Sequence, residues 1–272
     1  MTVDSQYSNL SYNLNEIEHR YGDNVHILND PFALSQLAKL CSPDVGQPQF
    51  NRLIEILYQR LLISVINTEF PRKKATVHSR MKEHTRRGVF RGELIDDETE
   101  VVTVDIARAG ILPSQVCYTY LNELMNPVRV RQDHLIMSRV TNPQDEVVGA
   151  KVSGEKIGGP VDGRIVLFPD PMGATGSSLS TAISYYKETF GGEPLRLITL
   201  NLIFTPEFVR RLKNDHPDVI MYACRLDRGM SPDEVLDTVP GERWDEESGL
   251  TDKHYIVPGG GGFGELMNNA WI

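Results

Sequence analysis

The sequence has few cysteines, no long apolar run and no excess of positive charge. Its 272 residues include three cysteines, at positions 41, 117 and 224, a number and spacing that fit neither a disulfide framework nor a zinc site. No apolar run is long enough to span a bilayer, and the N-terminus lacks the basic and then apolar segments of a signal peptide. We therefore expect a protein of the reducing cytoplasm that does not insert into membranes.

The balance of charge also excludes some partners. The chain has 28 Lys and Arg against 37 Asp and Glu, a formal charge of −9. Broad binding of nucleic acid or of a membrane surface needs a basic face, so we expect neither partner. A local basic pocket for an anionic small molecule is still compatible with this charge. Basic residues gather between Arg72 and Arg91, which is either a solvated face or an arm that packs on a partner subunit or helps to hold an anion.

The hydrophobic pattern predicts an α/β fold. Apolar residues make up 40% of the chain, which is typical of globular proteins. Helical spacing marks residues 34–40 and 53–66, and further on expected strands alternate with expected helices. The strands are predicted at 101–106, 128–140, 164–168, 195–204 and 219–224, and the intervening helices at 112–124, 179–190 and 206–213. This alternation predicts a mostly parallel central sheet flanked by helices.

Three segments interrupt this alternation. Residues 1–22 are polar and without a period, so we expect a loose N-terminal arm before a single domain at 23–272. Residues 142–162 are rich in glycine and polar side chains and form a long loop or a hairpin. An acidic insertion covers about 230–252, with one turn of helix at 232–236.

The chemistry concentrates first at residues 166–178. A short apolar strand ends at Asp170, a loop of small residues follows, and a helix begins near Ser178. This order presents main-chain N–H groups and hydroxyls at the positive end of a helix, which favours a phosphate. The lack of a lysine before the serines and the glycine spacing exclude a Walker loop and a dinucleotide fingerprint. Asp170 is either a turn carboxylate or a group that binds sugar hydroxyls or a hydrated metal.

Other candidates lie at the ends of other predicted strands. Arg108 stands in a small-residue turn, and it is either a surface arginine or part of an anion-binding turn. Arg139 precedes the long loop and is a similar candidate. Four glycines at 259–262 follow an apolar run, and they form either a flexible linker or a loop that approaches a ligand closely.

Taken in order, these stretches resemble the uracil phosphoribosyltransferases, a branch of the type I phosphoribosyltransferase fold. The resemblance covers about residues 25–265 and is carried by 105–110, 170–178, 216–219 with 227–229, and 255–259. It implies that uracil and 5-phosphoribosyl-1-pyrophosphate react to give UMP and pyrophosphate, with Mg²⁺ acting through the substrate phosphates. It also implies an N-terminal helical arm, a C-terminal hood over the base, and a homo-oligomer, either a dimer or a tetramer.

The resemblance assigns roles to matching residues. Asp170 and Arg108 would be the catalytic groups, at the ribose hydroxyls and the pyrophosphate. The donor would also contact Ala109, Gly110, Arg139, Ala174, Thr175, Gly176, Ser177 and Ser178. Uracil would be read by the main chain at Ile256, Gly261 and Phe263, with Gly262 in the same loop and Tyr255 beside the ring.

Several positions depart from the pattern of this family. Gly173 stands where the family usually has Leu, Ser177 where it usually has Gly, and Gly262 where it has an Asp near the reacting centre. Glu265 is close to that last position in sequence. Two alternatives therefore stay open beside uracil transfer. One is a non-catalytic nucleotide-binding regulator on the same fold, and the other is transfer to a different base.

Overall fold

The computed structural model describes residues 4–141, 147–190 and 192–270. Its α-helices are α1 (Pro31–Leu40), α2 (Gln49–Glu69), α3 (Ile111–Leu124), α4 (Ser177–Phe190), α5 (Pro206–Asp215), α6 (Asp233–Leu236) and α7 (Phe263–Asn268). Its strands are β1 (Val25–Ile27), β2 (Arg72–His78), β3 (Val89–Ile95), β4 (Val101–Ala107), β5 (Val130–Thr141), β6 (Val147–Lys156), β7 (Ile165–Pro169), β8 (Met172–Gly173), β9 (Arg196–Phe204) and β10 (Ile220–Leu226). Short 3₁₀ turns are η1 (Ser5–Tyr7), η2 (Arg80–Glu83), η3 (Pro127–Arg129) and η4 (Trp244–Glu246).

The central sheet is mostly parallel, as predicted. Its strand order is β1-β10-β9-β7-β4-β5-β6, with β8 paired to β9. All pairs are parallel except β5 with β6, which form an antiparallel hairpin at one edge. The segment expected as a loop or a hairpin is therefore the second arm of this hairpin where the structure describes it.

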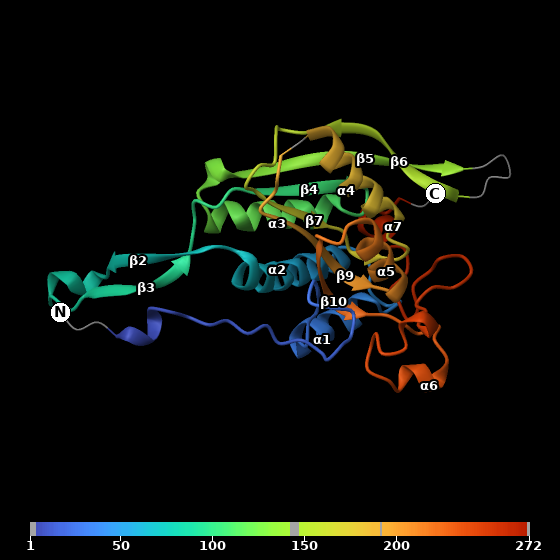
Figure 1. Cartoon of the computed structure of the whole chain (residues 1–272), viewed down its shortest axis with the longest axis horizontal. Coiled ribbons are helices and arrows are strands. Elements are labelled where there is room, and N and C mark those ends of the chain that lie inside the picture. Colours follow the sequence, from blue (N-terminus) through green and yellow to red (C-terminus); the bar gives the residue numbers. More distant parts are fainter. Residues whose placement is uncertain (1–3, 142–146, 191, 271–272) are drawn as a thin grey trace.

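Helices cover both faces of the sheet (Figure 1), because alternate strand side chains point to opposite faces. On one face, Val101 and Leu167 pack in a core with α1, α2, α3 and α7. On the other face, Val102 and Val166 pack in a second core with α4 and α5. None of the helices in the described part of the chain has the length and apolar character that crossing a membrane requires.

The predicted N-terminal helices are α1 and α2, and the segment that follows them and extends from the sheet is a β-hairpin. The apolar side chains of α2 recur at helical spacing, so this helix buries them against the sheet. The basic residues that follow form β2 and β3, an antiparallel pair that projects away from the other elements (Figure 1). The N-terminal segment runs beside this hairpin, where the rings of Tyr7 and Phe90 lie 6.0 Å apart.

The acidic insertion is ordered around one buried ion pair. Arg228 follows β10, and its Nη1 lies 2.9 Å from Oε1 of Glu247, whose side chain is fully buried. The Glu247 carboxylate also accepts hydrogen bonds from Tyr21 and from the main-chain N–H of Gly241. The insertion contains α6 and η4, of which α6 matches the turn of helix expected near residues 232–236.

Candidate active site

The predicted phosphate loop lies at the carboxyl end of β7 and leads into α4. The main-chain O of Pro171 accepts from the N–H groups of Leu202 and Ile203 on β9, each at 3.1 Å. Thr205, at the end of β9, donates from its hydroxyl to the main-chain O of Ala174 at 2.7 Å. Hydrogen bonds to β9 and Thr205 therefore fix the loop. The first N–H groups of α4 have no acceptors within the helix.

Those N–H groups lie where the sequence predicts a phosphate cradle. Within the described ranges, the main-chain N–H groups of Thr175, Gly176 and Ser178 find no hydrogen-bond acceptor. The N–H of Ser177 is taken by the hydroxyl of Thr175 at 3.3 Å. Together with the side-chain hydroxyls of this loop, these groups can receive the oxygens of a phosphate.

Two glycines of this loop have steric reasons to be glycine. Gly176 has a φ of +74°, and a Cβ there would stand 2.8 Å from Leu212 Cδ2 on α5. A Cβ at Gly173 would stand 2.8 Å from Cβ of Phe204 and 2.9 Å from the ring of Phe208. The absence of a larger residue at position 173 therefore follows from the aromatic pair beneath it.

Asp170 occupies the end of β7, directly before the cradle. Its Oδ1 accepts from the N–H of Met172 at 3.1 Å, and Oδ2 has no hydrogen-bond partner among the described residues. Burial raises the pKa of this carboxyl to about 6, against a smaller opposing effect of the Met172 N–H. A carboxylate with one free oxygen at the mouth of the sheet can accept hydrogen bonds from hydroxyl groups.

The Arg108 turn follows β4 and lies against the end of β7. A Cβ at Gly110 would stand 3.2 Å from the main-chain O of Pro169 and 2.8 Å from Ile106. This turn begins with a cis peptide bond between Ala107 and Arg108. The structure therefore brings the predicted pyrophosphate turn beside the predicted ribose carboxylate, although 62 residues separate Arg108 from Asp170.

The other side of the same turn contacts the C-terminal segment. A Cβ at Gly264 would stand 3.7 Å from the Cβ of Ala109. Arg108 Nη2 lies 3.4 Å from Oε1 of Glu265, and Arg108 Nη1 donates to the main-chain O of Ala270 at 3.1 Å. The sequence did not indicate this ion pair between the turn and α7.

The glycine loop is held by a charge pair at the end of β10. Asp227, only 1% exposed, binds the guanidinium of Arg225 through both carboxylate oxygens. The same carboxylate accepts from the N–H of Gly259, and Arg225 donates to the main-chain O of Gly259 at 3.0 Å. This loop is therefore an ordered part of the site edge and not a free linker.

Main-chain groups in the glycine loop are open for a ligand. Among the described residues, the N–H groups of Ile256, Gly261 and Phe263 make no hydrogen bond. The Phe263 side chain is buried and packs edge-on against Phe50, with ring centroids 5.2 Å apart. Tyr255 is 62% exposed. Phe263 thus anchors the loop through its ring and can contact a base only through its main chain.

One predicted site residue, Arg139, has a side chain outside the described part of the structure. One interacting pair near the site, Asp105 with His134, was not predicted. The backbone of Arg139 belongs to β5, but its side chain lies outside the described residues. Oδ2 of Asp105 on β4 shares a hydrogen bond of 2.9 Å with Nδ1 of His134, and Oδ1 of Asp105 is buried without a partner among the described residues. Burial raises the pKa of Asp105, against the effect of His134. An aspartate inside an otherwise apolar strand was the available signal.

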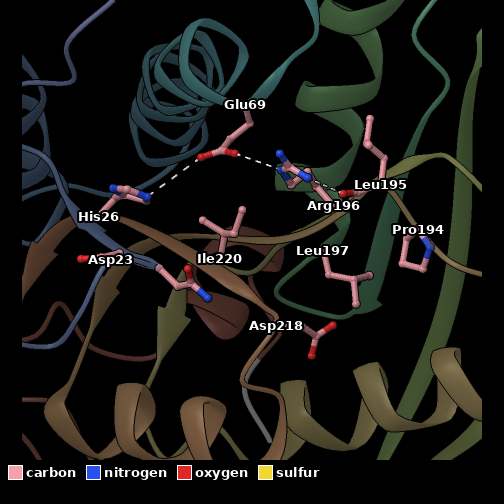
Figure 2. Close-up of a pocket in the computed structure, with 10 residues that line it drawn as sticks. Asp23, His26, Glu69, Pro194, Leu195, Arg196, Leu197, Asp218 and Ile220 are labelled. Atoms are coloured by element: carbon pink, nitrogen blue, oxygen red, sulfur yellow. Dashed lines mark hydrogen bonds and ion pairs between the residues drawn. The ribbon is translucent and has the colours of Figure 1, made fainter.

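A separate hollow of about 500 Å³ lies at the amino ends of the parallel strands, where β9 and β10 begin (Figure 2). Its Glu69 is already paired with Arg196, 3.5 Å away, and lies 4.0 Å from His26. None of the predicted site residues whose side chains the structure describes lines this hollow. Because ligands of parallel α/β sheets bind at the carboxyl ends of the strands, we assign the candidate active site to those ends, where β4 and β7 lead into the predicted loops.

Known proteins resemble this chain both in fold and in sequence. The AQ2163 protein from Aquifex aeolicus superimposes with a TM-score of 0.67 at 18% identity, covering 91% of this chain and 99% of that one. A uracil phosphoribosyltransferase from Dictyoglomus thermophilum is 26% identical over 243 residues, 89% of this chain and 98% of its own length. One from Thermosipho africanus is 28% identical over 248 residues, 89% of this chain and 97% of its own length.

The sequence model of one family covers most of the chain. Residues 27–242 match the family described as "Uracil phosphoribosyltransferase". This range contains the Arg108 turn, Asp170 and the phosphate cradle, and ends before the glycine loop. The chain belongs to the uracil phosphoribosyltransferase family and has its type I phosphoribosyltransferase fold.

Proposed function

We propose that the chain transfers the phosphoribosyl group of 5-phosphoribosyl-1-pyrophosphate to uracil and releases UMP and pyrophosphate. The observation that carries this proposal is the order of three subsites along one sheet edge. The Arg108 turn after β4 lies against the end of β7, from which the main-chain cradle continues, and against α7, which directly follows the glycine loop. This order fits a ligand with a phosphate, a sugar carrying a pyrophosphate, and a base.

The donor would bind across the first two subsites. Its 5-phosphate would accept hydrogen bonds from the cradle, and the Arg108 guanidinium would bind the pyrophosphate. The free oxygen of Asp170 would accept hydrogen bonds from the ribose hydroxyls. In the reaction a bond forms between a uracil nitrogen and the anomeric carbon, the bond from that carbon to pyrophosphate breaks, and the proton of that nitrogen is released to solvent. No protein nucleophile is needed, so positioning and stabilisation of the leaving group supply the catalysis.

Uracil would bind at the glycine loop. Its ring edge carries carbonyl acceptors and an N–H donor, and the open main-chain N–H groups of Ile256, Gly261 and Phe263 complement the carbonyls. Tyr255 is exposed beside this loop and can cover the ring. The names of the Dictyoglomus and Thermosipho relatives support uracil as the base.

We also propose Mg²⁺ as the cofactor, bound mainly through the donor phosphates. Mg²⁺ usually keeps several waters and binds substrate phosphate oxygens, so it needs few ligands from the protein. Asp170 has one carboxylate oxygen free to hold a hydrated ion. When bound, the ion would neutralise charge on the departing pyrophosphate.

A homo-oligomer is a further part of this proposal. The β2–β3 hairpin projects from the fold and exposes apolar side chains, among them Val77 at 47% and Met81 at 54%. We propose that a second copy of the chain covers them. Sedimentation of the full chain should give a dimer or a larger species, whereas a purely monomeric chain would contradict this part.

The test of the activity is a product assay with uracil, labelled phosphoribosyl pyrophosphate and Mg²⁺. UMP and pyrophosphate should form in equal amounts. A panel of other bases in the same assay identifies transfer to a different base. Tight binding of UMP or of the donor without turnover would instead support the nucleotide-binding regulator.

Asp170→Asn links this activity to the structure. The variant should fold, because the strand end contributes little to the core, but its kcat/KM should fall by about 100-fold. Asp237→Asn is the matched control, since Asp237 is exposed in the acidic insertion and belongs to none of the three subsites. Full activity of Asp170→Asn would remove this residue from the proposed site.

A further inference from the structure

Arg108, the proposed ligand of the pyrophosphate, is already occupied by groups of the chain itself. Its guanidinium contacts the Glu265 carboxylate at 3.4 Å and the main-chain O of Ala270 at 3.1 Å. The two side chains are 35% and 31% exposed, so water and solutes reach the pair. An ion pair this open and this long is weak and can exchange for another anion.

The same carboxylate also borders the glycine loop. A Cβ at Gly262 would collide with Oε2 of Glu265, so the carboxylate fills the space beside that glycine. Glu265 therefore contacts the proposed pyrophosphate ligand with one oxygen and the proposed base loop with the other. No other carboxylate of the described residues contacts both.

The helix that carries Glu265 is fixed, so exchange needs movement of its side chain alone. Phe263 and Met267 of α7 are buried in the core. Gln47 donates to the main-chain O of Leu266 at 2.9 Å and to that of Met267 at 3.2 Å.

We propose that Glu265 substitutes for the anionic donor at Arg108, and that donor binding releases it to position the base. This inference rests on the proposed function of the same site. A pyrophosphate carries more negative charge than a carboxylate and accepts hydrogen bonds from the same guanidinium N–H groups of Arg108. It therefore displaces Glu265. The released carboxylate then accepts an N–H of the base at the glycine loop. Donor binding thereby strengthens base binding, which makes Glu265 a positioning residue that couples the two subsites.

Calorimetry with pyrophosphate and with uracil tests this coupling on the full chain. The variant is Glu265→Gln, which keeps the shape and removes the charge. It should bind pyrophosphate about two- to five-fold more tightly, because an exposed ion pair no longer competes. Wild type should bind uracil more tightly when pyrophosphate is present, and Glu265→Gln should lose most of this enhancement. In turnover, the variant should show a lower KM for the donor and a higher KM for uracil.

Two controls separate charge and fold from the proposed contact. Glu188→Gln makes the same change of net charge at an exposed position of α4, and it should leave both affinities unchanged. Arg108→Ala should lose pyrophosphate binding, and adding Glu265→Gln to it should restore none. Equal pyrophosphate affinity of wild type and Glu265→Gln would overturn the inference alone. If wild type binds neither pyrophosphate nor the donor, the proposed function and this inference fail together.

Discussion

The main-chain N–H of Gly259 donates to Oδ2 of Asp227 at 2.7 Å, across 32 residues of sequence. The two oxygens of the same carboxylate also accept hydrogen bonds from Nε and Nη2 of Arg225. The shape of the glycine loop therefore depends on a charge pair at the end of β10. Because the acid is buried, its loss affects both the stability of the chain and the proposed base site.

Asp227→Asn tests this dependence. The change leaves the largely buried guanidinium of Arg225 without its counter-charge, so the free energy of unfolding should fall by about 3 kcal/mol. Urea denaturation measures this loss, and calorimetry with uracil should show weaker binding. Asp245→Asn, at an exposed position of the acidic insertion, is the control. If both variants unfold at the wild-type midpoint, the pair does not hold the loop.

The stability of the chain should depend on pH through Asp170. Burial raises its pKa from 3.8 to about 6, so between these values the folded chain binds more protons than the unfolded chain. The free energy of unfolding therefore decreases as the pH rises through this range. Between pH 5 and pH 8 this group should account for about 1 kcal/mol of that decrease.

Asp170→Asn removes this contribution, which urea denaturation at the two pH values measures. The variant should be less sensitive to pH than wild type and more stable than wild type at pH 8. Asp252→Asn should keep the wild-type dependence, since its side chain is exposed. Identical slopes for wild type and Asp170→Asn would show that the carboxyl titrates with an ordinary pKa.

An acid at position 262 should not by itself improve the site. In Gly262→Asp the new side chain would meet the carboxylate of Glu265, and the two like charges would repel each other. Thermal unfolding should show a melting temperature lower by a few degrees. Gly262→Asp combined with Glu265→Gln should recover much of it.

Gly46→Asp is the matched control for that change, because nothing lies within 4 Å of a Cβ at Gly46. It should leave the melting temperature close to that of wild type. An unchanged melting temperature of Gly262→Asp would contradict the repulsion by Glu265. A rise in its turnover would indicate that the native glycine stands where a carboxylate can assist catalysis.

Gly176→Ala should damage the phosphate cradle through crowding as well as through its backbone. A positive φ alone costs an alanine about 1 kcal/mol, and the contact with Leu212 adds to that cost. Gly163→Ala isolates the first part, since Gly163 has a φ of +66° and nothing lies within 4 Å of its Cβ position. Urea denaturation should therefore rank Gly176→Ala as the less stable variant, and equal losses would exclude the crowding.

The parts of the fold that were predictable have local causes. Apolar runs specified β4, β7 and β9, and helical spacing specified α2, because each pattern fits one way of burying side chains. The cradle was predictable for a similar reason. Strand, small residues and helix start are consecutive, so the main-chain groups of Thr175 and Ser178 need no distant partner to converge.

The contacts that complete the site join residues far apart in sequence. Arg108 and Glu265 are separated by 157 residues, and no periodicity connects them. The charge of Glu247 indicated a solvated loop, but its carboxylate is buried because Arg228 pairs with it. The basic segment formed a β-hairpin that its composition did not reveal, since charge distinguishes poorly between a loop and an exposed strand pair.

The buried Glu247 carboxylate also limits how this chain can change over evolution. It binds the N-terminal segment through Tyr21, the end of β10 through Arg228, and its own insertion through Gly241. Loss of this carboxylate alone, with the rest of the insertion kept, would leave the Arg228 guanidinium, only 12% exposed, without a counter-charge. We therefore expect Glu247 to be retained wherever the insertion and Arg228 are both present.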